Sequence, residues 1–360
     1  MKKTDIRLLP LGAKLGQDIF TSGGLLLLSK GKILDAALVR KLVSQGIIDV
    51  YLEHLEPGML DESSQFMDKD ESELREVINY SRAVVGEVLD QVRSGRPIEY
   101  DVLEDATDVI YSEVVNTNNI FRQLIALRDK DEYTLQHSVA VGALGVKICQ
   151  LLNWPESKAK HVGVAGILHD IGKAQISDSI INKPGSLSEI EWAEMKRHSQ
   201  YGYEILKNDC SVDPQVQMAV LQHHERINGK GYPLRLRDRQ IHPYAKIIAI
   251  ADTFDAITSD RSYQKPMSVF SAADELLKDA YRGGLEVETI LIFVDYLLDM
   301  APGEKVVLNT GEEAEIHLLN RNEPNRPLVR TSEGFVDLVR NREICIASFA
   351  NDNEKLSYQR

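Results

Sequence analysis

Cysteine and long apolar runs are both scarce in this chain of 360 residues. The three cysteines, Cys149, Cys210 and Cys345, are far apart and odd in number, so inert thiols are expected rather than a disulfide framework or a thiolate zinc site. No apolar run approaches the roughly 20 residues that a membrane-spanning helix requires. The N-terminal residues Met1–Asp5 lead into no signal-peptide core. We therefore expect a cytoplasmic protein without membrane contact.

An excess of positive charge is absent as well. The 42 Lys and Arg residues face 55 Asp and Glu residues, which gives a net charge of -13. Such a chain repels phosphate backbones, so a non-specific binder of DNA or RNA polymers is excluded. An anionic small molecule would need a local positive site, which metal ions and a few basic side chains could supply.

The first residues of the chain predict a small α+β module over 1–58. A hairpin is expected at Phe20–Ser29, because the Ser-Gly-Gly turn signal precedes an apolar run. A helix is expected over Asp35–Gln45 and a strand over Ile47–Leu52. The apolar fraction of 43% is ordinary for a protein that builds a core.

The rest of the chain predicts a mainly α fold with a β-rich end. Residues 59–128 form an acidic linker and helices, which break at Gly95-Arg96-Pro97. Residues 129–301 are helical throughout, apart from a turn-rich stretch at Asn228–Pro243, and residues 302–360 form a small β-rich extension. Its expected strands are Lys305–Leu308, Ala314–Leu319, Leu328–Thr331, Phe335–Leu338 and Ile344–Ile346.

A His-Asp pair, His169-Asp170, stands in the apolar run Gly166–Lys173. An ionised Asp in such surroundings requires a partner, and a metal ion is an economical one. The two residues would lie about 100° apart on a helix, so both side chains can point into one crevice.

Five further residues extend this pair to seven possible nitrogen and oxygen ligands: His137, His198, His223, His224 and Asp252. Seven ligands are too many for one tetrahedral structural site. They suit two metal ions that share a bridging carboxylate, and the donor types suit Fe, Mn, Ni, Co or Zn. The remaining histidines, His54, His161, His242 and His317, are expected to be structural or solvated. We predict a metal-dependent phosphoester hydrolase.

Substrate phosphates would be bound by basic residues near these ligands. Lys173 follows the His-Asp pair by one turn, and Arg261 can grip a phosphate bidentately, whereas Lys265 is a weaker candidate. Glu225 either orients a ligand imidazole or is simply solvated. Asp255 shares a helix face with Asp252 and is expected to support the site rather than to bind metal.

In these motifs the chain resembles HD-GYP domain proteins, a branch of the HD phosphohydrolase superfamily. The match runs from about residue 130 to about residue 275, in the order and spacing of the family. The motifs are Tyr133–Ser138, His169–Lys173, Lys183–Leu187, the long signature His223–Pro233, and Asp252–Arg261. More loosely, residues 1–58 resemble a module that often precedes this domain, and the β extension resembles a tail of some members.

The resemblance implies an HD-type helical bundle that hydrolyses cyclic di-GMP, a bacterial second messenger, to pGpG and often onward to GMP. It implies a centre of two or three metal ions, commonly Fe or Mn, in which Asp170 is the bridging ligand. Lys173 and Arg261 fall on positions that contact the substrate phosphates. By motif position, the implied metal ligands are His137, His169, Asp170, His198, His223, His224 and Asp252.

Three departures from the family pattern refine these expectations. Tyr133 stands where members with a third metal carry a Glu, so two metal ions are predicted. Asn228 replaces the usual Asp of the signature loop, and Asn-Gly forms an equally good turn. Gln264 occupies a position that is commonly basic, which weakens one phosphate contact.

Two other functions compete with the hydrolysis of cyclic di-GMP. The chain could be a non-catalytic cyclic-dinucleotide sensor, or a docking platform for diguanylate cyclases (GGDEF proteins) through Gly231-Tyr232-Pro233. It could instead hydrolyse cyclic GMP-AMP, because the ligand set recognises phosphate rather than base. Degenerate members usually lose ligands, so the complete set of seven favours catalysis. A homodimer is compatible with each of these functions.

Overall fold

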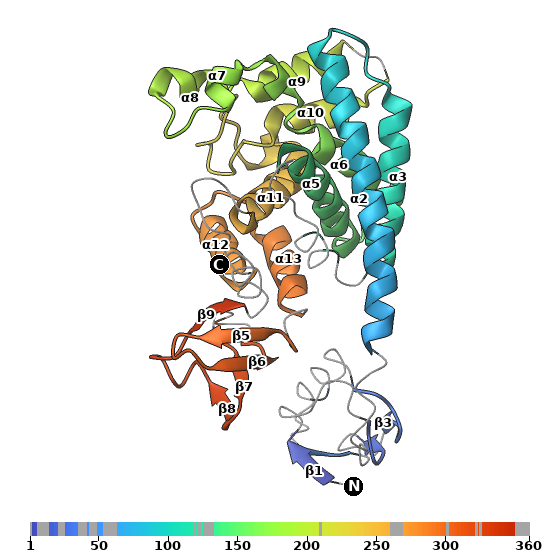
Figure 1. The fold of residues 1–360 in the computed structure, drawn as a ribbon, viewed down its shortest axis with the longest axis vertical. Coiled ribbons are helices and arrows are strands. Elements are labelled where there is room, and N and C mark those ends of the chain that lie inside the picture. Colours follow the sequence, from blue (N-terminus) through green and yellow to red (C-terminus); the bar gives the residue numbers. More distant parts are fainter. Residues whose placement is uncertain are drawn as a thin grey trace, which may run out of the picture. The chain divides into compact units, whose positions relative to one another are not determined.

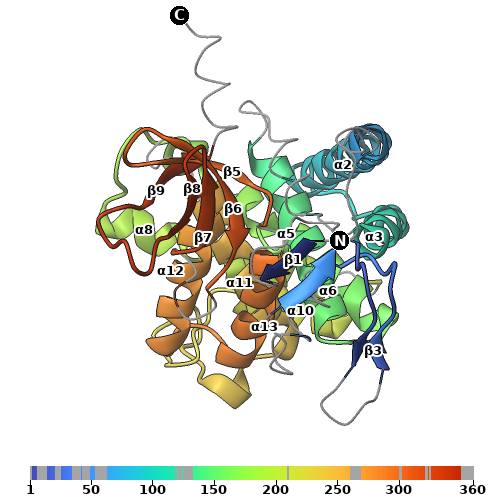
Figure 2. The same ribbon diagram turned by 90° about the horizontal axis from the view of Figure 1, so that it is seen from below.

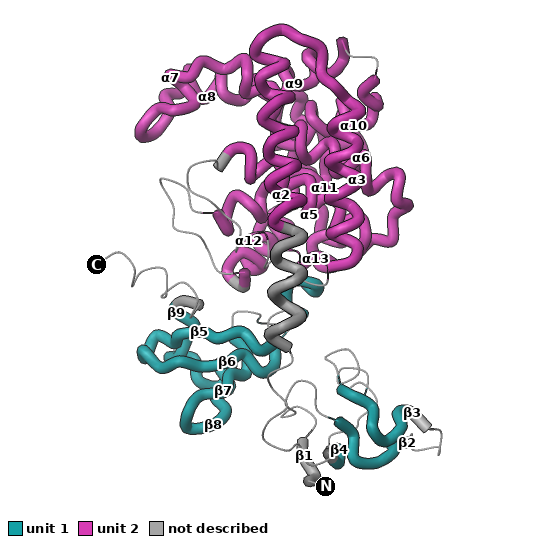
Figure 3. The backbone as a smooth tube through the Cα atoms, turned by 45° about the vertical axis from the view of Figure 1, so that its right-hand side comes forward, with its two compact units in different colours: residues 1–66, 295–360 teal, residues 67–294 magenta. Residues whose placement is uncertain are grey.

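A computed structural model shows a mainly α protein, as predicted, with its strands near the two ends of the chain (Figure 1). Residues 67–294 form one compact unit, and residues 1–66 together with 295–360 form the other (Figure 3). The domain boundaries predicted after residues 58, 128 and 301 stay predictions. The structure describes residues 2–5, 14–20, 26–34, 49–52, 63–117, 133–208, 211–259, 269–299, 302–320 and 326–349, and the single positions 42, 120, 124 and 323.

The N-terminal residues contain two short antiparallel pairs of strands. Strand β1 (Lys2–Asp5) pairs with β4 (Asp49–Leu52), and β2 (Ile19–Phe20) pairs with β3 (Leu26–Leu28). The predicted hairpin and the predicted strand that ends at Leu52 are therefore confirmed. The helix predicted over residues 35–45 lies outside the described residues, apart from position 42.

Two long helices, α2 (Ser63–Arg93) and α3 (Tyr100–Asn116), follow and are separated where the sequence predicts a break. Gly95 has φ +68°, a left-handed conformation that glycine adopts without steric cost. The side chain of Gln91 accepts a hydrogen bond from the amide of Glu99 at 3.2 Å, which ties the two helices together across the turn.

The helices of residues 133–299 build the main core around α11. This helix is apolar on most of its faces and is buried along almost its whole length, as expected for a helix at the centre of a bundle. None of the helices in the described part of the chain is long and apolar enough to cross a membrane. The elements are α5 (Tyr133–Leu151), α6 (Glu156–Leu168), η2 (Ile171–Gln175), α7 (Asp178–Ile181), α8 (Glu189–Met195), α9 (His198–Lys207), α10 (Pro214–Gln222), η3 (Asp238–Gln240), α11 (Pro243–Thr258), α12 (Val269–Tyr281) and α13 (Val287–Asp299).

Glycines allow α5 and α6 to touch backbone to backbone. A Cβ atom on Gly166 would lie 2.6 Å from the Cα atom of Gly142, closer than any side chain permits. The end of α6 is therefore held against α5 near the residues that follow it, His169 and Asp170. This contact places the predicted His-Asp pair close to His137, which lies in the first turns of α5.

The C-terminal extension, drawn in orange to red in Figure 2, is a five-stranded antiparallel sheet, and Figure 1 shows its strand order, β8-β7-β6-β5-β9. Side chains alternate between buried and more exposed positions along β5 and β7, so one face of the sheet carries its own small core. The predicted β-rich character is confirmed, although β9 begins two residues later than predicted. The strands are β5 (Lys305–Leu308), β6 (Glu313–Leu318), β7 (Leu328–Thr331), β8 (Gly334–Asp337) and β9 (Ile346–Phe349).

Candidate metal centre

The two adjacent pairs of predicted ligands lie just beyond helix ends, whereas the sequence suggested that they lie within helices. Helices α6 and α10 end one residue before His169 and His223. The last turn of a helix leaves carbonyl oxygens without intrahelical partners. The Nδ1 atoms of His169 and His223 lie 2.7 Å from two such oxygens, those of Gly166 and Val220. Each ring donates its Nδ1 proton backwards, so its Nε2 atom is left to act as a ligand.

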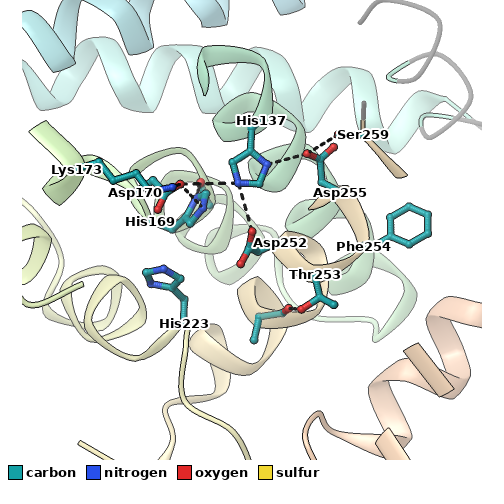
Figure 4. A network of polar contacts seen from close by, with 12 residues as sticks. His137, His169, Asp170, Lys173, His223, Asp252, Thr253, Phe254, Asp255 and Ser259 are labelled. Carbon is teal, nitrogen blue, oxygen red and sulfur yellow. Dashed lines mark hydrogen bonds and ion pairs between the residues drawn. The ribbon is translucent and has the colours of Figure 1, made fainter. Parts of the chain in front are cut away.

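The other predicted ligands come from three further helices. His198 is the first residue of α9, and its Nδ1 atom lies 2.7 Å from the carbonyl oxygen of Met195. His137 lies on α5 and Asp252 on α11. Figure 4 shows His137, His169 and the two carboxylates of residues 170 and 252 converging on one region. Long-range packing therefore brings together residues more than 100 positions apart.

Asp170 lies between the other ligands and faces them with both oxygens. Its Oδ2 atom is 3.3 Å from Nε2 of His169 and 3.9 Å from Nε2 of His137. Its Oδ1 atom is 3.4 Å from Nε2 of His198. A carboxylate with this arrangement is suited to link two cations.

All seven predicted ligand residues gather into two groups. Within each group, one possible ligand atom per residue lies within 4.8 Å of all the others. Asp170, His198, His223 and His224 form the four-residue group, and His137, His169 and Asp252 form the three-residue group. Among the described residues, these are the two sets of three or more such side chains with this spacing.

Burial sets the protonation of these side chains in the protein alone. Burial and the neighbouring histidines hold the pKa of His223 well below its usual range, and burial lowers the pKa of His224 to about 3. Burial would raise the pKa of Asp170, but Lys173 and His169 outweigh it and hold that pKa well below the usual range. The four-residue group thus contains neutral imidazoles and an ionised carboxylate, which are the forms that bind metal ions.

The pKa of His137 is shifted in the opposite direction to those of His198, His223 and His224. Burial alone would lower its pKa, but hydrogen bonds to Asp252 and Asp255 raise it to about 9. The Nε2 atom of His137 lies 3.3 Å from Oδ1 of Asp252. A cation bound at the three-residue group would displace the Nε2 proton, because both cannot occupy that lone pair.

Lys173 lies beside the carboxylate of Asp170. Its Nζ atom is 2.5 Å from Oδ2 of Asp170, and its side chain remains 34% exposed. The ammonium therefore has access both to the centre and to solvent. Arg261, Gln264 and Lys265 lie outside the described residues, and nothing is described of the Tyr133 side chain.

Glu225 plays neither of the two roles considered from the sequence. Its carboxylate is almost fully buried and accepts hydrogen bonds from the amides of Leu234 at 2.6 Å and Leu236 at 2.9 Å. It therefore anchors the loop 226–237, which contains most of the long signature. The sequence holds no local signal for this role, because the partners are backbone amides 9 and 11 residues away.

The anchored loop packs against the metal-centre residues. Gly231 lies on the backbone of the preceding helix end, and a Cβ atom there would fall 2.5 Å from the carbonyl oxygen of His224. The Tyr232 ring lies 4.6 Å from the ring of His224, centroid to centroid, and 6.4 Å from that of His198. Tyr232 thus covers one side of the four-residue group.

Asn228 stabilises the start of this loop. Its side-chain oxygen accepts a hydrogen bond from the amide of Lys230 at 3.0 Å, which forms an Asx turn. Its side-chain nitrogen donates to the carbonyl oxygen of Arg282 at 3.4 Å. An Asp at this position would keep the first bond and lose the second, so Asn serves the same turn.

The residues of this centre fit metal ions well. Imidazole nitrogen and carboxylate oxygen are the donors that first-row transition metals prefer. The centre also has two carboxylates, Asp170 and Asp252; despite burial, Lys173 and His169 hold the pKa of the first, and His137 that of the second, well below the usual range, so both are ionised and can bind cations. The cluster can therefore hold cations, and HD domain proteins are metal-dependent.

This fold and this cluster define a class of helical domain that can hold metal ions among buried histidines and aspartates. Residues 119–283 match the HD domain family, and this range includes every residue of both groups. For this part of the chain, the match confirms the resemblance that was recognised from its motifs.

Several characterised relatives are similar to the chain over this region. It is 36% identical to the cyclic di-GMP phosphodiesterase PA4108 of Pseudomonas aeruginosa, over 64% of this chain and 55% of the relative. It is 38% identical to 3'3'-cGAMP-specific phosphodiesterase 2 of Vibrio cholerae, over 42% of this chain and 29% of the relative. It is 38% identical to a cyclic di-GMP phosphodiesterase of Thermotoga maritima, over 41% of this chain and 40% of the relative. The chain thus spans about half or less of the length of these relatives.

A solved structure supports the fold. The protein Bd1817 of Bdellovibrio bacteriovorus, described as an HDG"Y"P protein, superposes with a TM-score of 0.51. The superposition covers 82% of this chain and 99% of that one, with 19% sequence identity. At that identity the likeness concerns the fold.

Proposed function

We propose that the chain is a metal-dependent phosphodiesterase that hydrolyses cyclic di-GMP to pGpG, and onward to GMP, in bacterial signalling. The observation that carries the proposal is the pair of ligand groups that meet at Asp170. The relatives from Pseudomonas aeruginosa and Thermotoga maritima, which are named as cyclic di-GMP phosphodiesterases, support the choice of substrate.

The proposed ligands are the seven residues of the two groups, and Fe and Mn are the proposed metals. Two such cations, when bound, neutralise the phosphodiester and lower the pKa of a water molecule toward neutrality. Asp170 contacts residues of both groups, and the buried imidazoles of His223 and His224 stay neutral. Lys173 would stabilise negative charge on the non-bridging phosphate oxygens. Arg261 and Lys265 are proposed as further phosphate contacts.

The test is metal content and turnover measured on one sample of the full chain purified without oxygen. About two Fe or Mn ions per chain and conversion of cyclic di-GMP to pGpG or GMP are expected. Asp170→Ala should abolish both turnover and stoichiometric metal binding, while circular dichroism shows the helices intact. His161→Ala, which alters a half-buried histidine outside both groups, is the matched control and should leave both readouts unchanged. Turnover retained by Asp170→Ala would refute the proposal.

Hydrolysis of cyclic GMP-AMP is the second candidate function. Three relatives from Vibrio cholerae, 32% to 38% identical, are named as 3'3'-cGAMP-specific phosphodiesterases. The ligand groups bind phosphate and do not distinguish guanine from adenine. Competition between the two cyclic dinucleotides in one reaction, with the ratio of kcat/KM values as the readout, decides between them.

A sensor or docking role would use the same surface without turnover. The loop that contains Gly231-Tyr232-Pro233 is the proposed contact for a GGDEF partner, and the neighbouring Leu234 is 51% exposed. The complete ligand set favours catalysis over this alternative. Tight binding of cyclic di-GMP by the metal-loaded chain without any product would support the sensor.

A further inference from the structure

The tautomers of the ligand histidines are set in two different ways. His169, His198 and His223 each point Nδ1 at a backbone carbonyl three residues earlier, at 2.7 Å in every case. His137 instead points Nδ1 at a side chain, the carboxylate of Asp255, also at 2.7 Å. The partner lies 118 residues away on α11 (Figure 4). The orientation of His137 therefore depends on tertiary packing and on one replaceable residue.

Asp255 is held firmly in this position. Its side chain is 2% exposed, and the hydroxyl of Ser259 donates to the same oxygen, Oδ2, at 3.2 Å. On α11, Asp255 lies three residues after Asp252 and four residues before Ser259, which directly follows the end of the helix. The helix thus presents one carboxylate to Nε2 of His137 and a second to Nδ1, at 3.3 Å and 2.7 Å.

We infer that Asp255 is a positioning residue that strengthens metal binding at the three-residue group alone, so that the two metal ions are held unequally. The inference rests on the proposed two-metal function. A carboxylate that accepts the Nδ1 proton fixes the tautomer of the imidazole and increases the basicity of its Nε2 atom. The four-residue group has no such carboxylate among the described hydrogen bonds, because His198 and His223 use neutral carbonyl oxygens.

The three-residue group is also surrounded by more negative charge than the four-residue group. Asp252 and Asp255 both contact His137, whereas Asp170 belongs to the four-residue group and contacts residues of both groups. The three-residue group therefore compensates for its smaller number of ligands with an additional negative charge behind one of them. Removal of that charge should weaken the binding of the metal ion at the three-residue group and leave the binding of the other unchanged.

The test is a calorimetric titration of metal-free full-length protein with Mn²⁺ under reducing conditions. Wild type should show two binding events. Asp255→Asn, which is isosteric and removes the charge, should weaken one event by about 10- to 100-fold and leave the other unchanged. Ser259→Ala should shift the same event in the same direction by a smaller factor. Asp274→Asn on α12, which removes a partly exposed charge paired with Lys278, is the matched control and should change neither event.

A double-mutant cycle with His137→Ala shows whether Asp255 acts through that ligand. The effect of Asp255→Asn on the affected binding event should vanish in the His137→Ala background, because the imidazole that residue 255 orients is then absent. Equal weakening of both events, or full additivity in the cycle, would mean a general structural role and overturn the inference. Two unchanged events in Asp255→Asn would overturn it as well, while the proposed function would stand. A wild-type protein that binds no metal would refute both.

Discussion

The contacts of the buried Glu225 carboxylate allow us to predict how much it stabilises loop 226–237. It accepts two backbone hydrogen bonds, from Leu234 and Leu236, and it is 2% exposed. A hydrogen bond to a charged group contributes about 1.5–3 kcal/mol, so two contribute about 3–6 kcal/mol at most. Leu234 is 51% exposed, which allows a released amide to reach water and reduces the loss. We expect Glu225→Ala to lower the local opening free energy of loop 226–237 by about 2–4 kcal/mol.

The assay is hydrogen exchange of the amides of Leu234 and Leu236, followed by mass spectrometry or NMR. A loss of about 2–4 kcal/mol corresponds to exchange that is faster by roughly 30- to 700-fold. Glu225→Gln keeps one acceptor oxygen and should show an intermediate increase. Glu76→Ala, an exposed Glu on α2, should leave both amides unchanged. Exchange of these amides within about threefold of wild type in Glu225→Ala would refute the anchoring role.

Three other outcomes are expected from the same structure. Gly231→Ala should destabilise the domain by about 1–3 kcal/mol in urea unfolding, because its Cβ atom would overlap the backbone of residues 224–226. Gly86→Ala on α2 is the control: its Cβ atom would lie 3.7 Å from the nearest atom, Cδ1 of Leu135, and the change should stabilise the domain by about 0.5–1 kcal/mol. The metal-free protein should be most stable near neutral pH. The pKa of His224 is lowered to about 3, so its contribution to stability is complete above about pH 6.5 and is lost as the pH falls toward 3. The pKa of His137 is raised to about 9, so its contribution is complete below about pH 6.5 and is lost as the pH rises through 9. Urea unfolding in a chelator from pH 4 to pH 9.5 checks this, and stability that rises steadily with acidification would contradict it. Asn228→Asp should keep its turn and change the unfolding free energy by less than about 1 kcal/mol, with turnover unchanged; a larger loss would show that the donated hydrogen bond at 3.4 Å is the essential one.

Local patterns determined most of the elements of this protein. The break at Gly95-Arg96-Pro97 separates α2 from α3, and the turn residues of the C-terminal extension separate its five strands. These predictions succeed because glycine and proline act on the backbone within a few residues of themselves. The assignment of both ligand pairs to helices was wrong: both helices end one residue earlier, and each imidazole donates its Nδ1 proton to a carbonyl oxygen in the last helical turn.

The motifs also determined which seven residues gather at the centre, because each sits in a recognisable local setting. Only the tertiary structure decided how they are divided. The four-residue and three-residue groups, with Asp170 between them, follow from the packing of α5 and α6 on one another and on α10 and α11, and from that of α9 on α10. His137 and Asp252, which belong to one group, are more than 100 positions apart, so no local pattern encodes the division.

The supporting residues show the same limit more clearly. Glu225 stands next to a ligand and turns away from it toward two distant amides, and Asp255 meets His137 across 118 residues. A carboxylate has the same local signal whether it is solvated, binds a metal, anchors a loop or orients a ring. Its role is decided by the donors that packing places within hydrogen-bond distance of its oxygens.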